Sequence, residues 1–335
     1  MDSLTVRILD AIGKNLINST RDDLKNAIRA AAGRVIVGET VAFKAPLIDG
    51  VTNVELLKSW GADMVNVNHY SVDMPMTPGL SSTDEGLAIW GAAWSGQPGR
   101  RPEPEAVEPS VQSYFLEFGF GRTLKEAKEL AGIPVGMTLD PVDPNARLAP
   151  ARIASRANAE KGVQHGASFI TLIHTPSMSE EQFAGSVKEV RAGAGDEALV
   201  LAGKMPWGGP FTTDPDEFIT EEEIAKLSDA GADVIIIPAP GTVPGLTIEI
   251  VKSWVQVISS LGLLAEVTIG TSQEGADPDV IRRIAIDSKM TGADLYQIGD
   301  GVYSGVATPE NVMAFANAIK GKRHALRRAA LSPLR

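Results

Sequence analysis

The sequence predicts an α/β protein in which eight strand–helix units close into a barrel, and three observations carry this prediction. A signature with a helix-closing glycine and a following apolar run recurs as "WGADMVNV", "HGASFITL", "AGADVIII" and "TGADLYQI". With related sites the apolar runs number about eight, mostly about 30 residues apart, the size of one βα unit. The runs are continuous, as in strands buried on both faces of a parallel sheet. A (β/α)8 (TIM) barrel fits this pattern, and a doubly wound open sheet is the alternative.

The predicted strands are short and rich in Val, Ile and Leu. In chain order they cover residues 34–39, 64–68, 135–139, 169–173, 199–203, 234–237, 264–269 and 295–298. Helical patterns such as "NVELLKSW", "TEEEIAKLSDA" and "DPDVIRRIAIDSKM" separate them. Asp277–Pro278 and Thr308–Pro309 are typical of a capping residue followed by proline at the first helical position.

Three segments lie outside the regular barrel pattern of residues 33–322. Residues 1–32 predict a helical extension, "SLTVRILDAI" and "TRDDLKNAIRAAAG", which covers the bottom of the barrel or packs on another subunit. Residues 70–122 form a long insertion after strand 2, which we interpret as a lid or a subunit contact. Residues 323–335 form a basic tail. The run "KGKRHALRR" of residues 320–328, which overlaps this tail, complements a helix end and the acidic body, or makes a subunit contact or an anion site.

The composition excludes several classes of protein. With 44% hydrophobic and 22% charged residues the chain is typical of globular proteins, and its net charge of −11 argues against a nucleic-acid surface. No apolar run reaches the roughly 18 residues of a membrane span, and the N-terminus lacks a signal pattern. Cysteine is absent, which excludes disulfides and thiolate chemistry. We expect a cytoplasmic homo-oligomer whose partner is a small-molecule substrate, with no role in nucleic-acid or membrane binding.

Polar residues stand at the predicted strand ends, which converge over the mouth of such a barrel. In chain order they are Glu39, Lys44, Asn66, Asn68, His69, Asp140, Asp143, His174 and Lys204. Lys204 and Lys44 are candidates for a Schiff base or for binding an enolate, and Lys204 paired with Glu39 or Asp140 is the structural alternative. His174 and Glu39 are candidate proton carriers, and a structural imidazole is the alternative for His174.

The loops after strands 7 and 8 predict a phosphate site, because glycines let backbone N–H groups approach an anion. These loops contain Gly270, Thr271, Ser272, Gly299, Asp300 and Gly301, which with Asn66 and Asn68 form the predicted substrate-binding set. Tight turns alone are the alternative for the glycines. Asp300 would repel phosphate and would instead hold a sugar hydroxyl or a metal, whereas Glu274 is expected on the solvated rim.

Asp140 and Asp143 of "LDPVDP" are spaced like a loose divalent-cation site, so Mg²⁺ is the candidate cofactor. The motifs DxDx[TV], GxxxxGK[ST], HExxH and GxSxG are all absent from the sequence. The chain therefore contains no recognisable nucleophile motif for hydrolysis.

The runs "IIIPAPGTVPG", "IGTSQEGAD", "GADLYQIGDGVYSG" and "KGKRHALRR" resemble a bacterial family of barrel proteins. Its members are labelled "haloacid dehalogenase-like" or "phosphoenolpyruvate phosphonomutase-like". The first label conflicts with the missing DxDx[TV] motif. The second implies a TIM barrel and a small oxyanionic substrate. Its superfamily has a "DADTGYG"-like segment after strand 3, where this chain has "LDPVDP", and acidic residues after strand 4, where this chain has His174 and Thr175.

We therefore predict an enzyme that acts on a small phosphorylated or carboxylated metabolite. The leading hypothesis is an aldolase-like lyase or an isomerase that stabilises an enolate or imine. The alternatives are a phosphonomutase-like Mg²⁺-dependent enzyme and a non-catalytic barrel that binds a phosphosugar and regulates through an oligomer contact.

Overall fold

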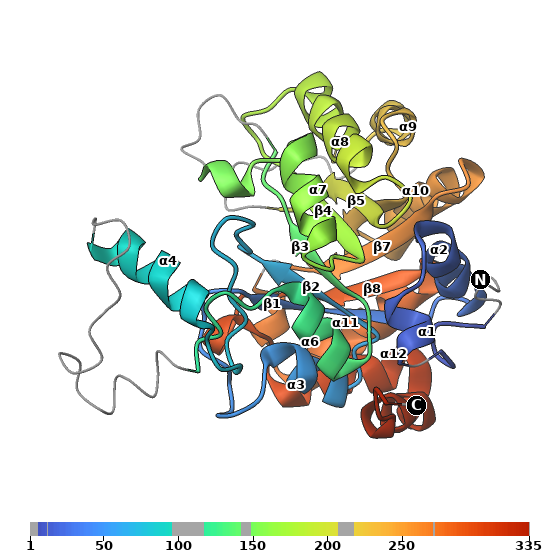
Figure 1. Cartoon of the computed structure of the whole chain (residues 1–335). Helices are drawn as coiled ribbons and strands as arrows, with labels where there is room; N and C mark the ends of the chain where they lie inside the picture. The colour runs from blue at the N-terminus through green and yellow to red at the C-terminus, as the bar shows by residue number, and fades with distance from the viewer. Residues whose placement is uncertain are drawn as a thin grey trace.

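The chain folds as a closed barrel of eight parallel strands in sequential order, as the sequence predicted (Figure 1). The computed structural model describes residues 6–11, 13–95, 117–141, 149–206, 218–270 and 272–334. Strand β8 pairs with β1 and closes the sheet, so the open-sheet alternative is wrong. The strands are β1 Val35–Val41, β2 Met64–Asn68, β3 Val135–Thr138, β4 Phe169–His174, β5 Leu199–Lys204, β6 Val234–Pro238, β7 Leu264–Ile269 and β8 Leu295–Ile298.

Helices surround the barrel and separate its strands (Figure 1). They are α1 Lys14–Ile17, α2 Arg21–Ala30, α3 Asn53–Ser59, α4 Asp84–Ser95, α6 Leu124–Ala131, α7 Arg156–Gln164, α8 Glu180–Ala194, α9 Glu221–Asp229, α10 Ile248–Ser260, α11 Pro278–Met290 and α12 Pro309–Ala330. Most begin at a Ser or Thr whose hydroxyl accepts a backbone N–H of the first turn, for example Thr52, which forms a full capping box with Glu55. None of the helices in these described ranges is long and apolar enough to cross a bilayer.

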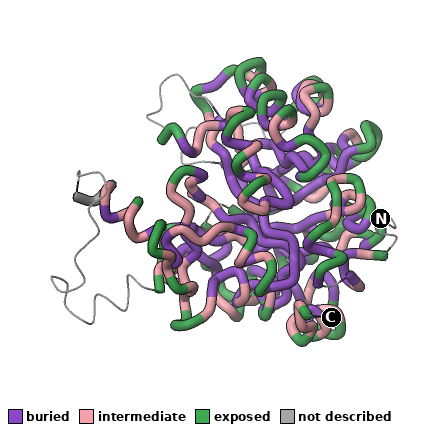
Figure 2. The backbone as a smooth tube through the Cα atoms, in the orientation of Figure 1, coloured by how far each residue is buried: buried purple, intermediate pink, exposed green. Residues whose placement is uncertain are grey.

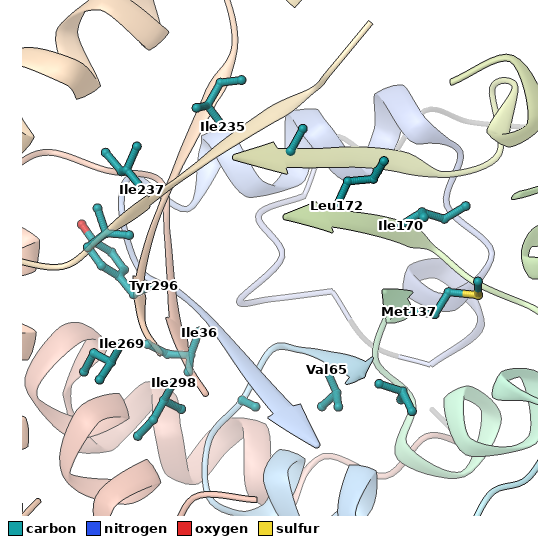
Figure 3. Packing of buried hydrophobic residues seen from close by; sticks show 14 of the residues in the cluster. Ile36, Val65, Met137, Ile170, Leu172, Ile235, Ile237, Ile269, Tyr296 and Ile298 are labelled. Atoms are coloured by element: carbon teal, nitrogen blue, oxygen red, sulfur yellow. The ribbon is translucent and has the colours of Figure 1, made fainter. Parts of the chain in front are cut away.

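Strand side chains alternate between the two sides of the barrel wall and so form two cores. Outward residues such as Ile36, Ile170 and Ile235 pack under the helices (Figure 3). Inward residues such as Val37 and Phe169 fill the lower half of the barrel. Figure 2 shows the resulting buried centre under an exposed outer ring of helices.

The recurring "GAD" signature has a structural role at the bottom of the barrel. Asp63, Asp233 and Asp294 each precede a strand and accept a backbone N–H of the preceding strand at 3.0 Å. The glycine of each signature has a positive φ, which a residue with a Cβ rarely adopts. The signature therefore closes each helix and aligns two neighbouring strands.

The N-terminal extension covers the bottom of the barrel, one of its two predicted places. Leu24 and Ile28 of α2 pack against the inward residues of the lower core. The guanidinium of Arg21 lies 2.6 Å from the Asp233 carboxylate and fastens α2 there. The predicted first helix over "SLTVRILDAI" is wrong for its described residues 6–11, which form turns. A short helix, α1, follows instead.

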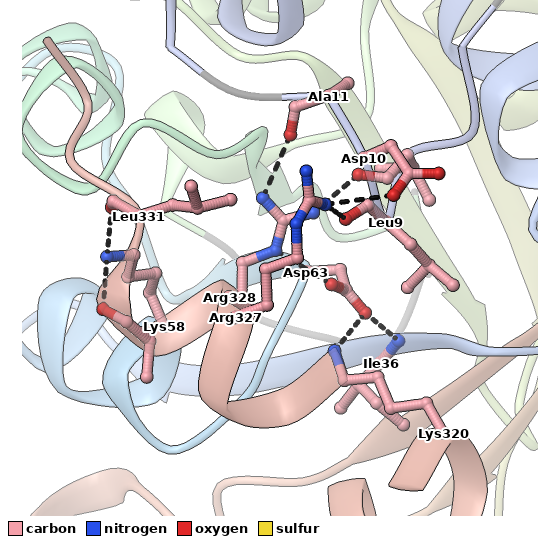
Figure 4. A network of polar contacts seen from close by, with 12 residues as sticks. Leu9, Asp10, Ala11, Ile36, Lys58, Asp63, Lys320, Arg327, Arg328 and Leu331 are labelled. Atoms are coloured by element: carbon pink, nitrogen blue, oxygen red, sulfur yellow. Dashed lines mark hydrogen bonds and ion pairs between the residues drawn. The ribbon is translucent and has the colours of Figure 1, made fainter. Parts of the chain in front are cut away.

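Residues 323–330, predicted as part of a basic tail, continue α12 beyond a kink at Gly321. Lys320 and Arg328 reach the buried carboxylate of Asp63, and Arg327 binds the carbonyl oxygen of Leu9 and the carboxylate of Asp10 (Figure 4). These three cations therefore have partners within the chain.

The insertion after β2 contains α4, which projects away from the barrel (Figure 1). Its aromatic neighbours pack together, with the Trp90 and Phe120 ring centroids 4.7 Å apart. Residues 96–116 lie outside the described part of the chain. The lid, the subunit contact and the homo-oligomer stay predictions.

Candidate functional site

A cavity of about 650 Å³ lies at the carboxyl ends of the strands, where side chains were predicted to converge. The β8–β1–β2 side and the adjoining loops present polar and acidic groups, including Glu39, Glu274 and Asp300. The β4–β6 side presents apolar groups, including Ile173 and Ile236. The cavity therefore has one acidic wall and one apolar wall.

Glu39 lines this cavity from an inward position of β1. One carboxylate oxygen accepts a hydrogen bond from Asn66 Nδ2 at 2.9 Å, and the other accepts one from Gln297 Nε2 at 3.1 Å. Burial raises the pKa of Glu39 well above its usual value, and the nearby carboxylates of Asp300 and Glu266 raise it further. Glu39 is thus a buried carboxyl group held in place by two amides.

Asn66 connects four strands beneath the cavity. Its Nδ2 also donates to the hydroxyl of Thr138 at 3.0 Å, and its Oδ1 accepts from the hydroxyl of Thr171 at 3.4 Å. Since Asn66 is fully buried and does not line the cavity, it positions Glu39 and does not reach a ligand. Its place in the predicted substrate-binding set is therefore wrong.

Glu266 is a buried carboxylate that the sequence analysis missed. It faces inward from β7, with 0% exposure, and accepts a hydrogen bond from the Thr268 hydroxyl at 3.4 Å. Burial raises its pKa to about 8, so it is protonated at neutral pH. A carboxylate at an inward position of the apolar run "LAEVTI" was the signal that could have identified it.

Glu274 was expected on the solvated rim, and this prediction is wrong. Only 2% of its surface is exposed, and one carboxylate oxygen accepts the backbone N–H of Gly301 at 2.9 Å. A Cβ at position 301 would lie 2.3 Å from that oxygen, so the close approach requires glycine. The Gly299 N–H donates to the carbonyl oxygen of Ile269 at 2.8 Å. Two of the three glycine amides predicted to bind phosphate, those of Gly299 and Gly301, therefore have acceptors within the chain.

The remaining residues of the predicted β7–β8 loop site lie around the same rim. Gly270 and Ser272 line the cavity, and a Cβ at Gly270 would lie 2.9 Å from the methyl carbon of Met205. Ser272 has a φ of 70° and precedes the short 3-10 turn Gln273–Gly275. Thr271 lies outside the described residues.

Asn68 and Asp300 meet at the mouth, as their positions predicted. Asn68 Nδ2 donates to the Asp300 carboxylate at 3.1 Å, and Asn68 Oδ1 accepts the backbone N–H of His69 at 2.8 Å. Burial raises the pKa of Asp300. The His69 imidazole also lines the cavity, and burial together with the charge of Arg152 lowers its pKa to about 4. His69 is therefore neutral at physiological pH.

Asp140 lines the cavity but is paired with Arg152, whose guanidinium lies 2.8 Å from the Asp140 carboxylate. Asp143, its predicted partner in a metal site, lies outside the described residues. No group of three or more His, Asp or Glu side chains in the described ranges is arranged to hold a metal ion. The Mg²⁺ site expected at Asp140 and Asp143 stays a prediction.

Lys204 and His174 do not face the cavity. Side chains alternate along a strand, and the inward positions of β4 and β5 are the odd-numbered ones, so residues 174 and 204 point outward. There Lys204 forms an ion pair with Glu223 of α9, rather than with Glu39 or Asp140. His174 lies beside it, against the ring of Phe183.

Lys44 lines a separate small pocket between β1 and α3. Its Nζ lies 5.8 Å from the centroid of the Phe43 ring. The structure therefore leaves three of the predicted catalytic residues, Lys44, His174 and Lys204, outside the cavity. The predicted site residues that line it, together with Glu274, are Glu39, Asn68, Asp140, Gly270, Ser272 and Asp300.

The fold and the cavity define a (β/α)8 barrel protein with an acidic site at the carboxyl ends of its strands. The chain belongs to the family described as a domain of unknown function (DUF7916), whose model matches residues 9–335. No curated protein matches the chain.

Solved structures of TIM-barrel enzymes are similar to the chain at low sequence identity. A 2,3-dimethylmalate lyase of the PEP mutase/isocitrate lyase superfamily is 15% identical, with 83% of this chain and 79% of that chain covered and a TM-score of 0.45. An archaeal fructose 1,6-bisphosphate aldolase is 13% identical, with coverage of 87% and 95% and a TM-score of 0.49. Dihydropteroate synthase from Thermus thermophilus is 14% identical, with coverage of 85% and 91% and a TM-score of 0.42. Similarity at this level carries no information about the reaction.

Proposed function

We propose that the chain is a lyase or isomerase that moves a proton at a carbon next to a carbonyl group of a small metabolite. The observation that carries this proposal is Glu39, a proton carrier held by Asn66 and Gln297 and open to the central cavity. Catalytic acids need a pKa near the working pH, and a carboxyl group reaches it through burial and neighbouring carboxylates.

Glu39 and His69 have complementary roles. Glu39, whose pKa is raised well above its usual value by burial and neighbouring carboxylates, is the acid and donates a proton to the carbonyl oxygen of the substrate. His69, with a pKa of about 4, is neutral and accepts the proton that leaves the carbon. These transfers give an enol, an imidazolium and a Glu39 carboxylate. With an α-hydroxy carbonyl substrate the enol is an enediol; the imidazolium returns its proton to the former carbonyl carbon while the Glu39 carboxylate takes the proton of the other hydroxyl group, which completes an isomerisation. In a lyase reaction His69 instead takes the proton of a β-hydroxyl group, the carbon–carbon bond breaks to give an aldehyde, and its electron pair forms the enol as Glu39 protonates the carbonyl oxygen.

The enol route agrees with the geometry better than an imine route. Every lysine of the sequence lies in the described part of the chain, and none lines the cavity. Lys204, the predicted Schiff-base residue, is paired with Glu223 on the outer side of the wall. Borohydride with a carbonyl substrate is therefore expected to leave the protein unmodified.

From the phosphonomutase-like resemblance we retain only the barrel fold and a small oxyanionic substrate. The Mg²⁺ route is the less favoured alternative because Asp140 is engaged by Arg152. A phosphate on the substrate would bind elsewhere than at the amides of Gly299 and Gly301, which already have acceptors.

Deuterium incorporation from D2O, followed by proton NMR, tests the proposal with a panel of 2-keto acids, hydroxy acids and aldehydes. We expect enzyme-dependent exchange at the carbon next to the carbonyl group of one compound class. Glu39→Gln should slow it by a factor of about 10² or more, the usual contribution of a general acid. Glu189→Gln, an exposed change on α8, should leave it unchanged.

Exchange at the wild-type rate in Glu39→Gln would reject the assignment. Thermal stabilisation by a ligand that neither exchanges nor turns over would instead support the non-catalytic barrel. The acid–base pair also predicts a rate that falls as pH drops through about 4, where His69 becomes charged, and as pH rises through the raised pKa of Glu39.

A further inference from the structure

We propose that the substrate carries a protonated amino group, which binds between the carboxylates of Glu274 and Asp300. This inference rests on the proposed function, because it assigns a substrate class to the same cavity. It replaces the phosphate predicted from the glycines of the β7 and β8 loops with a ligand group of opposite charge.

The balance of charges in the cavity lining is the first argument. Glu39, Asp140, Glu274 and Asp300 are acidic, whereas Arg152 is the one Lys or Arg in the described lining. Arg152 is already engaged by Asp140. Glu39, Glu274 and Asp300 therefore face the cavity without a cation of the described chain beside them, and a cationic ligand held between Glu274 and Asp300 would stabilise the charged forms of those two groups.

The second, independent argument is the position of Glu274. It is 98% buried, lines the cavity, and has one carboxylate oxygen without a hydrogen-bond partner among the described residues. Its other oxygen is fixed by the backbone N–H of Gly301. Burying a carboxylate oxygen without a hydrogen-bond donor costs free energy. The unpaired oxygen of the fixed Glu274 side chain therefore indicates that a ligand supplies the missing donor. An ammonium group supplies three N–H donors and the matching charge.

Asp300 completes the proposed cation-binding subsite from the β8 side. Asn68 holds one oxygen of its carboxylate at 3.1 Å, and both residues line the cavity. Asp300 directly precedes Gly301, whose backbone N–H binds Glu274, and both carboxyl groups line the same cavity as Glu39. A phosphate placed there would meet three acidic groups and no free glycine amide at position 299 or 301.

The size and the apolar wall of the cavity distinguish an organic amine from a bare metal ion. A volume of about 650 Å³ is far larger than an ion needs. The side chains of Ile173, Met205, Ile236 and Val243 offer a surface for a carbon skeleton. Within the described ranges, moreover, no three acidic or imidazole groups are arranged around a metal position.

Isothermal titration with three probes tests the inference on the wild-type protein: 5-amino-1-pentanol, its uncharged counterpart 1,5-pentanediol, and inorganic phosphate. We expect the amine to bind at least tenfold more tightly than the diol, and phosphate to show no binding at the cavity. Titrations in buffers of different ionisation enthalpy should show proton release, since the bound cation lowers the pKa of carboxyl groups that were raised by burial. Equal affinity for amine and diol, or a preference for phosphate, would overturn the inference.

Two variants locate the amine. Asp300→Asn and Glu274→Gln keep the shape and hydrogen-bonding oxygen of each side chain and remove its charge, so each should reduce amine affinity about tenfold or more and leave diol affinity unchanged. Glu189→Gln is the matched control with the same change of net charge. If Glu274→Gln fails to fold, Asp300→Asn decides, and unchanged amine affinity in the folded variant contradicts the inference. These measurements require no turnover, so their failure is separate from a failure of the Glu39 exchange experiment.

Discussion

Asp63 is a residue whose single carboxylate joins three parts of the molecule. It is fully buried and accepts hydrogen bonds from Lys320 Nζ at 2.6 Å, Arg328 Nε at 3.0 Å and the backbone N–H of Ile36 at 3.0 Å (Figure 4). The two cations hold its pKa below the usual value despite the burial. The carboxylate therefore links α12 to the β1–β2 edge, and Arg328 extends this link to the N-terminal segment through the carbonyl oxygens of Ile8 and Ala11.

Asp63→Asn should destabilise the protein by about 3–5 kcal/mol, because it leaves Lys320 and Arg328 buried without a counter-charge. Since the folded pKa of Asp63 is lowered, its contribution is present above the unfolded pKa of about 4 and is lost as pH falls through the folded value. Urea unfolding at pH 7 measures the change. Asp279→Asn, which removes a charge that is 93% exposed, is the control and should cost less than about 1 kcal/mol.

Glu266 should make stability depend on pH in the direction opposite to that of Asp63. Its folded pKa of about 8 is raised, so the stability it confers through its protonated form is fully present below the unfolded pKa of about 4 and is lost as pH rises through 8. The full change in the free energy of unfolding across this pH range is on the order of 5 kcal/mol. Thermal unfolding between pH 5 and 9 should show a flatter pH dependence in Glu266→Gln than in the wild type. Parallel curves would contradict this assignment.

At the scale of elements, the alternation of side chains along the strands decides which polar residues reach the cavity. Glu39 and Asn68 occupy inward positions, whereas His174 and Lys204 follow an inward residue and therefore point outward. Position at a strand end thus predicted the correct edge of the barrel for all four residues. Whether each side chain faces the cavity or the surrounding helices could be determined only from the strand register.

Replacing each of two helix glycines with alanine should change the stability of the protein in opposite directions. Gly321 has a φ of 78° at the kink of α12, and no atom lies within 4 Å of an added Cβ, so Gly321→Ala should destabilise the protein by about 1 kcal/mol through backbone strain alone. Gly185 lies exposed within α8 with equally open space, so Gly185→Ala should stabilise it by roughly 0.5–1 kcal/mol. Chemical denaturation of the pair measures both. The same sign for both variants would refute the explanation.

At the scale of the whole molecule, the N-terminal extension is part of the barrel core. Leu24, 1% exposed, packs with the inward residues of the strands, and Arg21 and Arg191 converge on Asp233 beside it. The lower core is therefore complete only when α2 is in place.

Leu24→Ala should destabilise the whole barrel by about 2–5 kcal/mol, because it opens a cavity in this core. Leu326→Ala on α12, where the side chain is 68% exposed, should change stability by about 0.5 kcal/mol at most. Circular dichroism and tryptophan fluorescence should follow one common transition in Leu24→Ala, shifted to lower urea. A separate early transition of the extension alone would show that it is not part of this core.

The sequence by itself determined the eight strands, most of the helices and the edge at which the site lies. These features depend on local patterns: an apolar run, a helix-closing glycine and a capping residue each act over a few residues. Strands β2, β7 and β8 agree with the prediction at both ends for this reason.

Only the tertiary structure decided which polar groups meet. Glu274 and Gly301 are 27 residues apart, and Glu39 and Gln297 are 258 residues apart. Pairing of β7 with β8 brings the first pair together, and closure of the barrel between β8 and β1 brings the second. The register of β5 turns Lys204 outward to Glu223. Contacts between distant residues depend on strand register and loop path, which leave no local pattern in the sequence. The acidic character of the site was therefore decided by the fold.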